Sequence, residues 1–258
     1  MPIQKQNKYK PHLKVNDISS LGRSHRVFGH KTGRSHHLFS DLELAVFLLL
    51  EWSDKIAEIN EQIELNLDET LSIANEAGIN HPKQGGNYKV MTSDFYVTFR
   101  KSNQPNTTQL AIQAKYSEDL EDGRTLEKIE IERRFWKKKE IDFRIITELE
   151  IPKIVLDNIK WLYPAKNSNL TKLSFELFEY YAGQLSNYKH LTLIEFCKKC
   201  DLANDSEIGT SLSEIKALLA HNYMSFDIRN DYKKILCSDI VLAKELYYDY
   251  IIEEMKIA

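Results

Sequence analysis

The side chains with the clearest chemical use lie in two short segments, residues 93–99 and 110–116. Both segments alternate apolar and polar residues, which predicts strands with one buried face. Gln113 and Lys115 are two residues apart and share a face, while Asp94 stands at a strand start, where aspartate is a poor fit. If the strands pair as a hairpin, the acid, the amide and the amine meet at one end. The alternative interpretation of Gln113 and Lys115 is an ordinary amphipathic strand.

A second carboxylate, Glu43, lies near the start of a segment, residues 41–52, that is apolar nearly all round. This segment predicts a largely buried helix. A buried carboxylate must be paired, capped or bound to a metal ion, because unpaired burial is costly. Ser40 stands three residues before Glu43 and predicts a capping box, so a structural role and a metal-binding role both stay open.

These residue types suit phosphodiester hydrolysis, in which cations offset charge on the phosphate and on the leaving oxygen. Mg²⁺ prefers carboxylate, carbonyl and water oxygens, and Glu43 and Asp94 could supply the carboxylates. Lys115 could orient or activate the attacking water, or neutralise charge in the transition state. We find no phosphate-loop, dinucleotide or Ser-His-Asp signature, which argues against ATP hydrolysis by this chain.

Charge is distributed unevenly along the chain, whose net charge is −3. Residues 1–40 hold eight Lys or Arg against one acid, so they carry +7 and the other 218 residues carry −10. A basic arm of this kind predicts phosphate contacts, with a solvated tail as the alternative. Gly22-Arg-Ser-His25 recurs as Gly33-Arg-Ser-His36, and the intervening glycines predict a short hairpin. The DNA-binding candidates are Arg23, Arg26, Lys31 and Arg34, and phosphate contact is also expected of His36 and His37.

Hydrophobic periodicity predicts an α/β domain followed by a mostly helical one. In the first, helices are expected at 41–52, 68–77, 126–139 and 152–163, strands at 58–65, 93–100, 108–116 and 143–147, and a loop at 81–87. This order predicts a mixed sheet flanked by helices. The polar stretch 164–169 predicts the domain boundary, so that the basic arm and the α/β domain occupy residues 1–163.

Residues 164–258 predict helices at 170–181, 192–201 and 212–220, then strands at 223–228 and 235–238. Helices followed by a two-stranded wing are the winged-helix pattern, which binds partners or DNA. Cys197 and Cys200 have zinc-like spacing, but a structural zinc needs four ligands, and we expect them to pack as small apolar residues. The longest apolar run, Leu44–Leu50, is too short for a bilayer, and the polar start lacks a signal core, so a cytoplasmic protein is expected.

Asp94 followed by Gln113-Ala-Lys115 resembles the active-site motif of the PD-(D/E)xK nucleases. Over a longer stretch, the chain resembles the TnsA family, the endonuclease subunits of heteromeric bacterial transposases. The matching segments lie in order over residues 22–163. They include Gly22-Arg-Ser-His-Arg, His36-His-Leu-Phe-Ser-Asp-Leu-Glu-Leu-Ala-Val-Phe, Ala111-Ile-Gln-Ala-Lys, Glu132-Arg-Arg-Phe-Trp and Asn158-Ile-Lys-Trp-Leu-Tyr163. A weaker match follows at residues 210–218.

The resemblance implies a restriction-endonuclease-like fold in which Glu43, Asp94 and Lys115 form a catalytic triad. Glu43 and Asp94 would bind Mg²⁺, with Mn²⁺ as a substitute. Gln113 would replace the usual acid and take part in metal coordination, and Glu132 would support the site from behind the metal ligands.

The resemblance also implies partners. Members of the family cut the 5′ ends of the transposon, while a TnsB-type transposase recognises those ends and makes the 3′ cuts. A TnsC-type ATP-dependent regulator contacts the carboxyl-terminal region. We therefore expect transposon-end DNA and these two proteins as partners, and no membrane. Because Gln113 is neutral, metal affinity should be modest without a DNA phosphate as a further ligand, so we expect little cleavage by the isolated chain.

Three other interpretations stay open at this point. A stand-alone nuclease of restriction or repair type would cut DNA without partners. A non-catalytic adaptor between transposase and regulator would tolerate substitution of Asp94 and Lys115. A winged-helix regulator would bind a specific DNA sequence through residues 164–258 alone.

Overall fold

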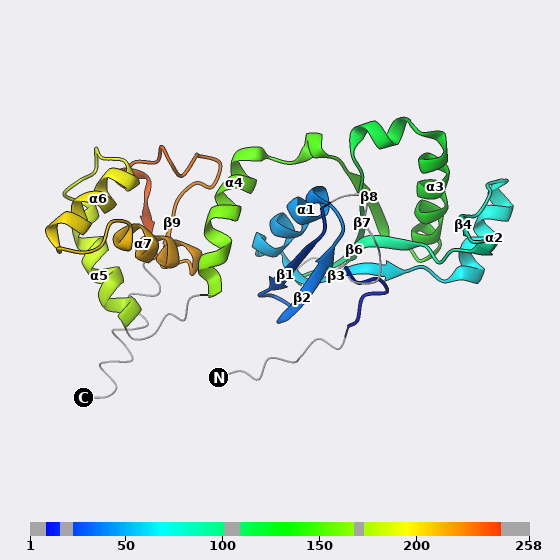
Figure 1. Cartoon of the computed structure of the whole chain (residues 1–258), viewed down its shortest axis with the longest axis horizontal. Helices are drawn as coiled ribbons and strands as arrows, with labels where there is room; N and C mark the ends of the chain where they lie inside the picture. Colours follow the sequence, from blue (N-terminus) through cyan, green and yellow to red (C-terminus); the bar gives the residue numbers. More distant parts are fainter. Residues whose placement is uncertain (1–8, 16–22, 101–108, 168–172, 244–258) are drawn as a thin grey trace. The chain divides into compact units, whose positions relative to one another are not determined.

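A computed structural model describes residues 9–15, 23–100, 109–167 and 173–243 of the chain. Its contacts divide the chain into two compact units, Met1–Ile151 and Pro152–Ala258 (Figure 1). Each unit is described by itself below. The predicted boundary lay at residue 163, so the helix expected at 152–163 falls in the second unit rather than the first.

A four-stranded mixed sheet organises the first unit. Its order is β3-β6-β7-β8, with antiparallel pairing between the first three strands and parallel pairing between β7 and β8. The strands are β3 (Ile56–Glu64), β6 (Thr92–Phe99), β7 (Gln109–Ala114) and β8 (Asp142–Ile146). The predicted mixed sheet is therefore confirmed. The parallel step requires a crossover, which the helix α3 (Gly123–Lys138) supplies.

Local signals explain where the helices of this unit begin and end. The helix α1 (Asp41–Trp52) has the predicted bounds because the Ser40 side chain accepts a hydrogen bond from the Glu43 N–H. The helix α2 (Leu67–Ala77) is capped by Asn66 and ends at Gly78, whose φ of 67° is the left-handed conformation that glycine adopts at low cost.

Two hairpins accompany the sheet. The strands β1 (His25–Gly29) and β2 (Arg34–Leu38) pair antiparallel, which confirms the hairpin predicted in the basic arm. The strands β4 (Lys83–Gln84) and β5 (Asn87–Tyr88) form a second hairpin where only a loop was predicted. Gly85 and Gly86 link them with φ of 58° and 87°, the conformation of a type I′ turn.

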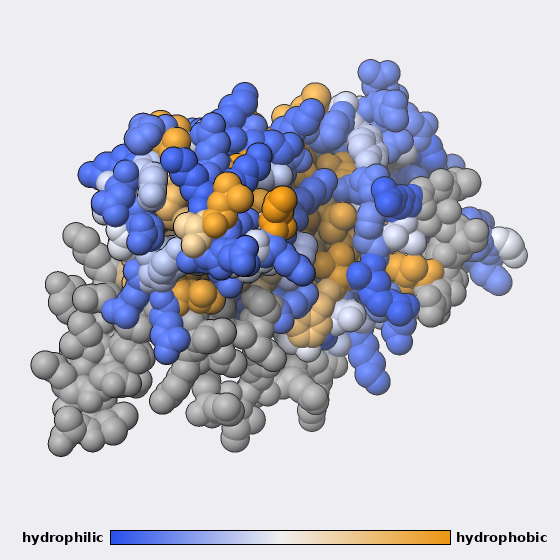
Figure 2. All heavy atoms as spheres, turned by 60° about the vertical axis from the view of Figure 1, so that its left-hand side comes forward, coloured by the Kyte–Doolittle hydropathy of each residue, from blue (hydrophilic) through white to orange (hydrophobic). Residues whose placement is uncertain are grey.

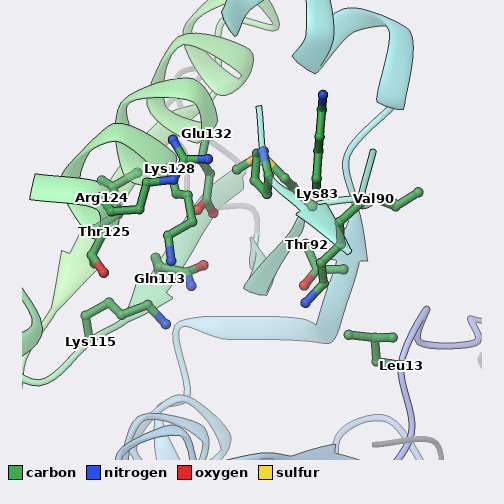
Figure 3. A pocket seen from close by; sticks show the side chains of 14 residues that line it. Leu13, Lys83, Val90, Thr92, Gln113, Lys115, Arg124, Thr125, Lys128 and Glu132 are labelled. Atoms are coloured by element: carbon green, nitrogen blue, oxygen red, sulfur yellow. The ribbon is translucent and has the colours of Figure 1, made fainter. Parts of the chain in front are cut away.

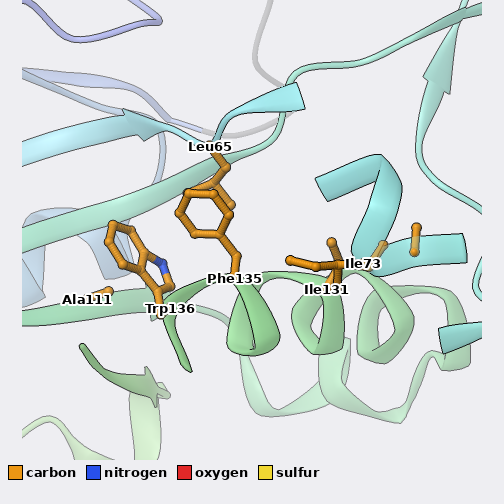
Figure 4. Close-up of a cluster of buried hydrophobic side chains, with 7 residues drawn as sticks. Leu65, Ile73, Ala111, Ile131, Phe135 and Trp136 are labelled. Atoms are coloured by element: carbon orange, nitrogen blue, oxygen red, sulfur yellow. The ribbon is translucent and has the colours of Figure 1, made fainter. Parts of the chain in front are cut away.

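The helices pack on opposite faces of the sheet. On one face, α2 and α3 bury a cluster against the sheet (Figure 4), made of Leu65, Ile73, Ala74, Ala111, Ile131, Phe135 and Trp136. The Trp136 ring stacks on Tyr96 at 5.4 Å between centroids, so its predicted place in the core is confirmed. On the other face, α1 contacts β3 and β7 above buried residues such as Phe95 and Ile112. Both faces are buried, which fixes the strand register around the candidate residues.

The second unit is mostly helical. Its elements are α4 (Lys153–Leu162), α5 (Leu173–Leu185), α6 (Leu193–Ala203), α7 (Thr210–Ala220), β9 (Met224–Ser225) and β10 (Val241–Leu242). Buried Asn158 ties α4 to this unit, because its amide donates to the carbonyls of Ile228 and Asn230 at 2.8 and 2.7 Å. These bonds explain why the unit begins at residue 152.

One strand of this unit was misplaced. The strand predicted at 235–238 is wrong, because residues 237–239 form a 3₁₀ turn. The strand that pairs with β9 is β10 instead. Three helices followed by a short antiparallel pair match the predicted order, and the winged-helix identity stays a prediction. Cys197 and Cys200 are buried on α6.

The surface of the described residues is mixed in character. On the face in Figure 2, apolar side chains lie among hydrophilic ones. Among the described residues, no helix combines the length and the apolar character needed to cross a bilayer.

Candidate active site

Glu43 is both a cap and a buried acid. Its carboxylate accepts hydrogen bonds from the Phe39 N–H at 2.9 Å and from the Ser40 hydroxyl at 3.2 Å. Only 7% of the residue is exposed. The two roles left open by the sequence are therefore compatible, since the capping bonds hold the carboxylate at the sheet end of α1, within electrostatic range of Asp94.

Asp94 and Gln113 meet where β6 and β7 separate. The backbone pairing of the two strands ends at Phe95 and Ile112. Beyond that point, the Asp94 N–H donates to Gln113 Oε1 at 3.2 Å, and the Ala114 N–H donates to Asp94 Oδ2 at 2.8 Å. Side chains thus replace the backbone ladder, which satisfies the buried amides while directing Asp94 into the site.

Gln62 joins the two acids and was missed by the sequence analysis. Its amide nitrogen lies 3.3 Å from Glu43 Oε2 and 3.4 Å from Asp94 Oδ1. The Thr92 hydroxyl donates to its amide oxygen at 3.2 Å, which holds the amide in this orientation. Gln62 has a φ of 52°, an uncommon value for a residue other than glycine, and lies between Glu61 and Ile63, which pair with Phe95 and Ser93 of β6.

The site has unusual electrostatics because its acids are buried close together. Burial, reinforced by the charge of Asp94, raises the pKa of Glu43 to about 8. Burial also raises the pKa of Asp94, although Lys115 and the Ala114 N–H oppose the shift. Lys115 therefore acts electrostatically on both acids.

Glu132 extends this group from α3. It is 3% exposed, and it accepts a hydrogen bond from the Ser93 hydroxyl. Burial raises its pKa to about 8, and the charges of Asp94 and Lys115 act on it in opposite directions. All five residues expected at the site, Glu43, Asp94, Gln113, Lys115 and Glu132, are thus brought together by the fold. Among the described residues, no three His, Cys, Asp or Glu side chains cluster as a metal-binding group.

The basic hairpin divides into a structural part and an exposed part. Arg34 was predicted to contact DNA, but both of its terminal nitrogens donate to Glu61, at 2.8 and 2.7 Å. His36 is fully buried, with Nδ1 at 2.7 Å from the same carboxylate and Nε2 at 2.7 Å from the Thr32 hydroxyl. These two residues fasten the hairpin to β3, which leaves neither of them available for phosphate. Arg23 and Arg26 are exposed and Lys31 is half-buried.

Gly29 explains one feature of this hairpin. A Cβ at this position would lie 2.6 Å from His36 Nε2, a distance that real contacts essentially never show. Glycine is therefore needed for the close approach of the hairpin backbone to the buried imidazole.

Two carboxylates, an amide and a lysine that meet beside a mixed sheet, one from a helix and the others from strand ends, are typical of hydrolytic nucleases that act on phosphodiesters. Comparisons with known proteins agree. A family model described as "TnsA-like endonuclease N terminal" matches residues 53–148, and one described as "TnsA endonuclease C terminal" matches residues 150–228. The chain is 42% identical over 243 residues to the transposon Tn7 transposition protein TnsA of Escherichia coli, covering 92% of this chain and 85% of that protein.

The chain belongs to the TnsA endonuclease family, as the sequence resemblance indicated. It is a DNA endonuclease that serves in transposition. Asp94, Gln113, Lys115 and Glu132 lie inside the matched amino-terminal segment, and Glu43 lies ten residues before its start at residue 53.

Proposed function

We propose that this endonuclease cuts the 5′ ends of a transposon, using a divalent cation held by Glu43 and Asp94. Mg²⁺ is the expected ion, with Mn²⁺ as a substitute. The observation that carries the proposal is the convergence of one oxygen from each carboxylate on the amide nitrogen of Gln62, at 3.3 and 3.4 Å. An N–H₂ group there occupies the kind of position that a cation between two acids would take.

The donor set fits a hard cation. Glu43, Asp94 and Gln113 offer carboxylate and amide oxygens, the ligands that Mg²⁺ prefers, and Mg²⁺ commonly keeps several waters as well. The raised pKa of Glu43, about 8, supports the same assignment, because a bound cation would favour the ionised acid. When bound, the cation would supply positive charge to the scissile phosphate and to the leaving oxygen.

Lys115 and Glu132 have supporting roles in this proposal. The Lys115 ammonium would stabilise negative charge in the transition state or orient the attacking water. Glu132 would hold Ser93, its hydrogen-bond partner, from behind the ligands and so position the start of β6. Because only two of the proposed ligands are acidic, a DNA phosphate would complete the ligand set, and the isolated chain would cut poorly.

The proposal includes an assembly. Transposon-end DNA would be presented by a TnsB-type transposase that makes the 3′ cuts, and a TnsC-type ATP-dependent regulator would contact the second unit. That unit would act as a winged-helix-like docking domain. The assembly would work in the cytoplasm.

Strand-specific mapping of cuts tests this proposal. The wild-type chain and Asp94→Ala would each be combined with the neighbouring transposase and a plasmid that carries the transposon. The expected result is loss of the 5′ cuts with the variant and persistence of the 3′ cuts. Unchanged 5′ cuts with Asp94→Ala would refute the catalytic role and favour an adaptor. Strong Mg²⁺-dependent cleavage of naked plasmid by the chain alone would favour a stand-alone nuclease.

A further inference from the structure

A basic cleft opens beside the candidate active site (Figure 3). Its volume is about 440 Å³, and it lies between the β4–β5 region and the amino-terminal half of α3. Gln113, Lys115 and Glu132 form part of its wall, so it is continuous with the site. The charged residues that line the cleft are Lys83, Lys89, Lys115, Arg124, Lys128 and Glu132.

Five of these six charged residues are cations, although the chain as a whole carries a net charge of −3. The sole acid of the wall, Glu132, is buried and hydrogen-bonded to Ser93. The cleft is therefore a local concentration of positive charge on an acidic protein. Such a concentration attracts a polyanion more strongly than the net charge would suggest.

Two of the cleft lysines form no ion pair within the described part of the chain, although the charge of Lys128 acts on Asp122. Lys89 and Lys128 form no ion pair there, whereas Arg124 pairs with Glu127 and the Lys83 ammonium lies over the Tyr88 ring at 4.7 Å. Figure 3 shows Lys115 and Lys128 approaching Gln113 from two sides. The ammonium groups of Lys115 and Lys128 thus face the cleft next to the proposed catalytic residues. Lys89 also lines the cleft.

At the carboxyl-terminal half of α3, by contrast, most basic side chains form ion pairs. Arg133 and Arg134 both pair with Glu130, at 2.7 and 2.6 Å. Lys138 pairs with Glu76 at 3.1 Å, and Lys139, which caps the helix, pairs with Glu69 at 3.0 Å. Four of the five basic residues at that end pair with acids of the same chain, and Lys137 is the exception among the described residues.

The remaining wall of the cleft suits a sugar-phosphate chain. Val90, Met91 and Ile129 supply apolar surface. Cations can contact phosphate oxygens, while apolar groups can pack against deoxyribose. A small free anion would use only part of this surface.

We infer that the cleft binds the sugar-phosphate backbone of the DNA strand that is cut, beside the scissile phosphate, and that Lys89 and Lys128 contact its phosphates. This inference rests on the proposed function, since it takes the scissile phosphate to lie at Glu43 and Asp94. It assigns the DNA track to the α3 side of the site, whereas the sequence analysis assigned DNA contacts to the β1–β2 hairpin.

The first test measures DNA binding without cleavage. The full-length Lys89→Gln/Lys128→Gln double variant and the matched Lys138→Gln/Lys139→Gln variant would be titrated with transposon-end duplex in EDTA over a salt series. Each lost phosphate contact should reduce the slope of log K against log salt by about 0.9, so the cleft variant should lose about 1.8. The control variant removes the same charge from paired lysines and should keep the wild-type slope.

The outcomes of this titration are decisive. Equal slopes for the cleft and control variants would overturn the inference, and so would a wild-type chain whose DNA binding does not depend on salt. Circular dichroism and thermal unfolding would confirm that both variants are folded. The result is independent of the catalytic proposal, because EDTA removes the cation and no cutting is measured.

A second test locates the contacted phosphates inside the assembled complex. Uncharged methylphosphonates would replace single phosphates near the 5′ cut, and cutting would be measured with the partner transposase present. A contacted phosphate should lower the cutting rate about tenfold when neutralised in the wild type, but have little further effect in Lys89→Gln/Lys128→Gln. Additive losses at every position would overturn the inference. Failure of Asp94→Ala to stop 5′ cutting would instead refute the proposed catalytic role and leave the titration result standing.

Discussion

The neighbouring β3 residues Glu61 and Gln62 belong to two buried acidic centres with opposite surroundings. Glu61 is itself the acid of the first centre, and Gln62 contacts the two acids of the second, Glu43 and Asp94. Glu61 is surrounded by cations, because Arg34 and His36 both contact its carboxylate. Among the described residues, Glu43 and Asp94 meet only neutral donors at hydrogen-bond distance, and the amide of Gln62 contacts both acids. Their pKa values diverge accordingly. That of Glu61 is lowered to about 2, and that of Glu43 is raised to about 8.

The causes of these pKa shifts support different roles for the two acids. Burial alone would raise the pKa of Glu61, but the hydrogen bonds and charges of His36 and Arg34 outweigh it. At Glu43, burial and the charge of Asp94 act together, and Lys115 compensates only in part. The chain completes Glu61 with its own cations and leaves Glu43 and Asp94 without one at hydrogen-bond distance, which supports the proposal that the second pair binds an external cation.

The largest expected effect contrasts the two acids directly, by the same acid-to-amide change. Glu43→Gln should lower 5′ cutting about 10³-fold or more, because losing a metal ligand removes several kcal/mol of transition-state stabilisation. Glu61→Gln should leave the cutting rate per folded molecule within a few-fold of wild type. The measurement is single-turnover cutting in the assembled complex, with the folded fraction determined separately.

The order of the two variants should be the opposite in a stability assay without metal, where Glu61→Gln should lose more stability than Glu43→Gln. In EDTA at pH 8, Glu43→Gln should unfold no earlier than the wild type, since the fold disfavours the ionised form of an acid whose pKa it raises. A strong loss of stability in Glu43→Gln, or a strong loss of cutting in Glu61→Gln, would remove the distinction between the two centres.

The second largest expected effect is the loss of folding stability when Glu61 is replaced. Glu61→Gln should cost about 3 kcal/mol at pH 7, because it leaves Arg34 and His36 without their acid. The pKa of Glu61 is lowered in the fold, so its contribution is complete above its ordinary value of 4.5 and declines as the pH falls toward 2. The gap between variant and wild type should therefore narrow by about 1.4 kcal/mol per pH unit over that range. Urea unfolding at several pH values measures it, and a gap that does not change with pH would contradict this account.

Replacing Gln62 should have a smaller effect on stability and a specific effect on the response to metal. Gln62→Ala should destabilise the metal-free protein by about 2 kcal/mol, because two hydrogen bonds to carboxylates are lost. Added Mn²⁺ should then raise the melting temperature of the variant more than that of the wild type, since the cation relieves the uncompensated acids. Thr92→Val, which removes only the anchor of the amide oxygen, serves as a milder control. Equal shifts with metal in all three proteins would show that Gln62 does not share the space between the acids.

The sequence predicted the elements that follow from local rules. The bounds of α1 followed from the Ser40 cap, and the meeting of Asp94 with Gln113 followed from the alternation of two strands that pair. The short β4–β5 hairpin was missed although the pair Gly85 and Gly86 is a recognised turn signal. The strand misplaced at 235–238 was short, and short apolar runs are ambiguous by periodicity alone.

The parts that could not be predicted depend on distant pairing. Arg34 is indistinguishable in sequence from a phosphate-binding arginine, because its acidic partner Glu61 is 27 residues away. Gln62 looks like any polar strand residue, and its acidic partners Glu43 and Asp94 lie 19 and 32 residues away in the sequence. The paired and unpaired lysines of α3 likewise differ only through acids on other elements. The distribution of charged residues along the sequence therefore did not predict which cations are paired in the fold, nor the position of the basic cleft.

The smallest predicted effect concerns the neutral member of the site. Gln113→Glu adds a third acid beside Asp94, which should increase the affinity of the DNA-free chain for Mn²⁺ about tenfold, or about 1.4 kcal/mol. Gln109→Glu, at the other end of the same strand, is the matched control and should leave the affinity unchanged. Isothermal titration measures both. If Gln113→Glu binds Mn²⁺ no better than the control, Gln113 does not face the cation. Two carboxylates would then be the whole contribution of the protein, and the dependence on a DNA phosphate for the remaining ligands would be greater still.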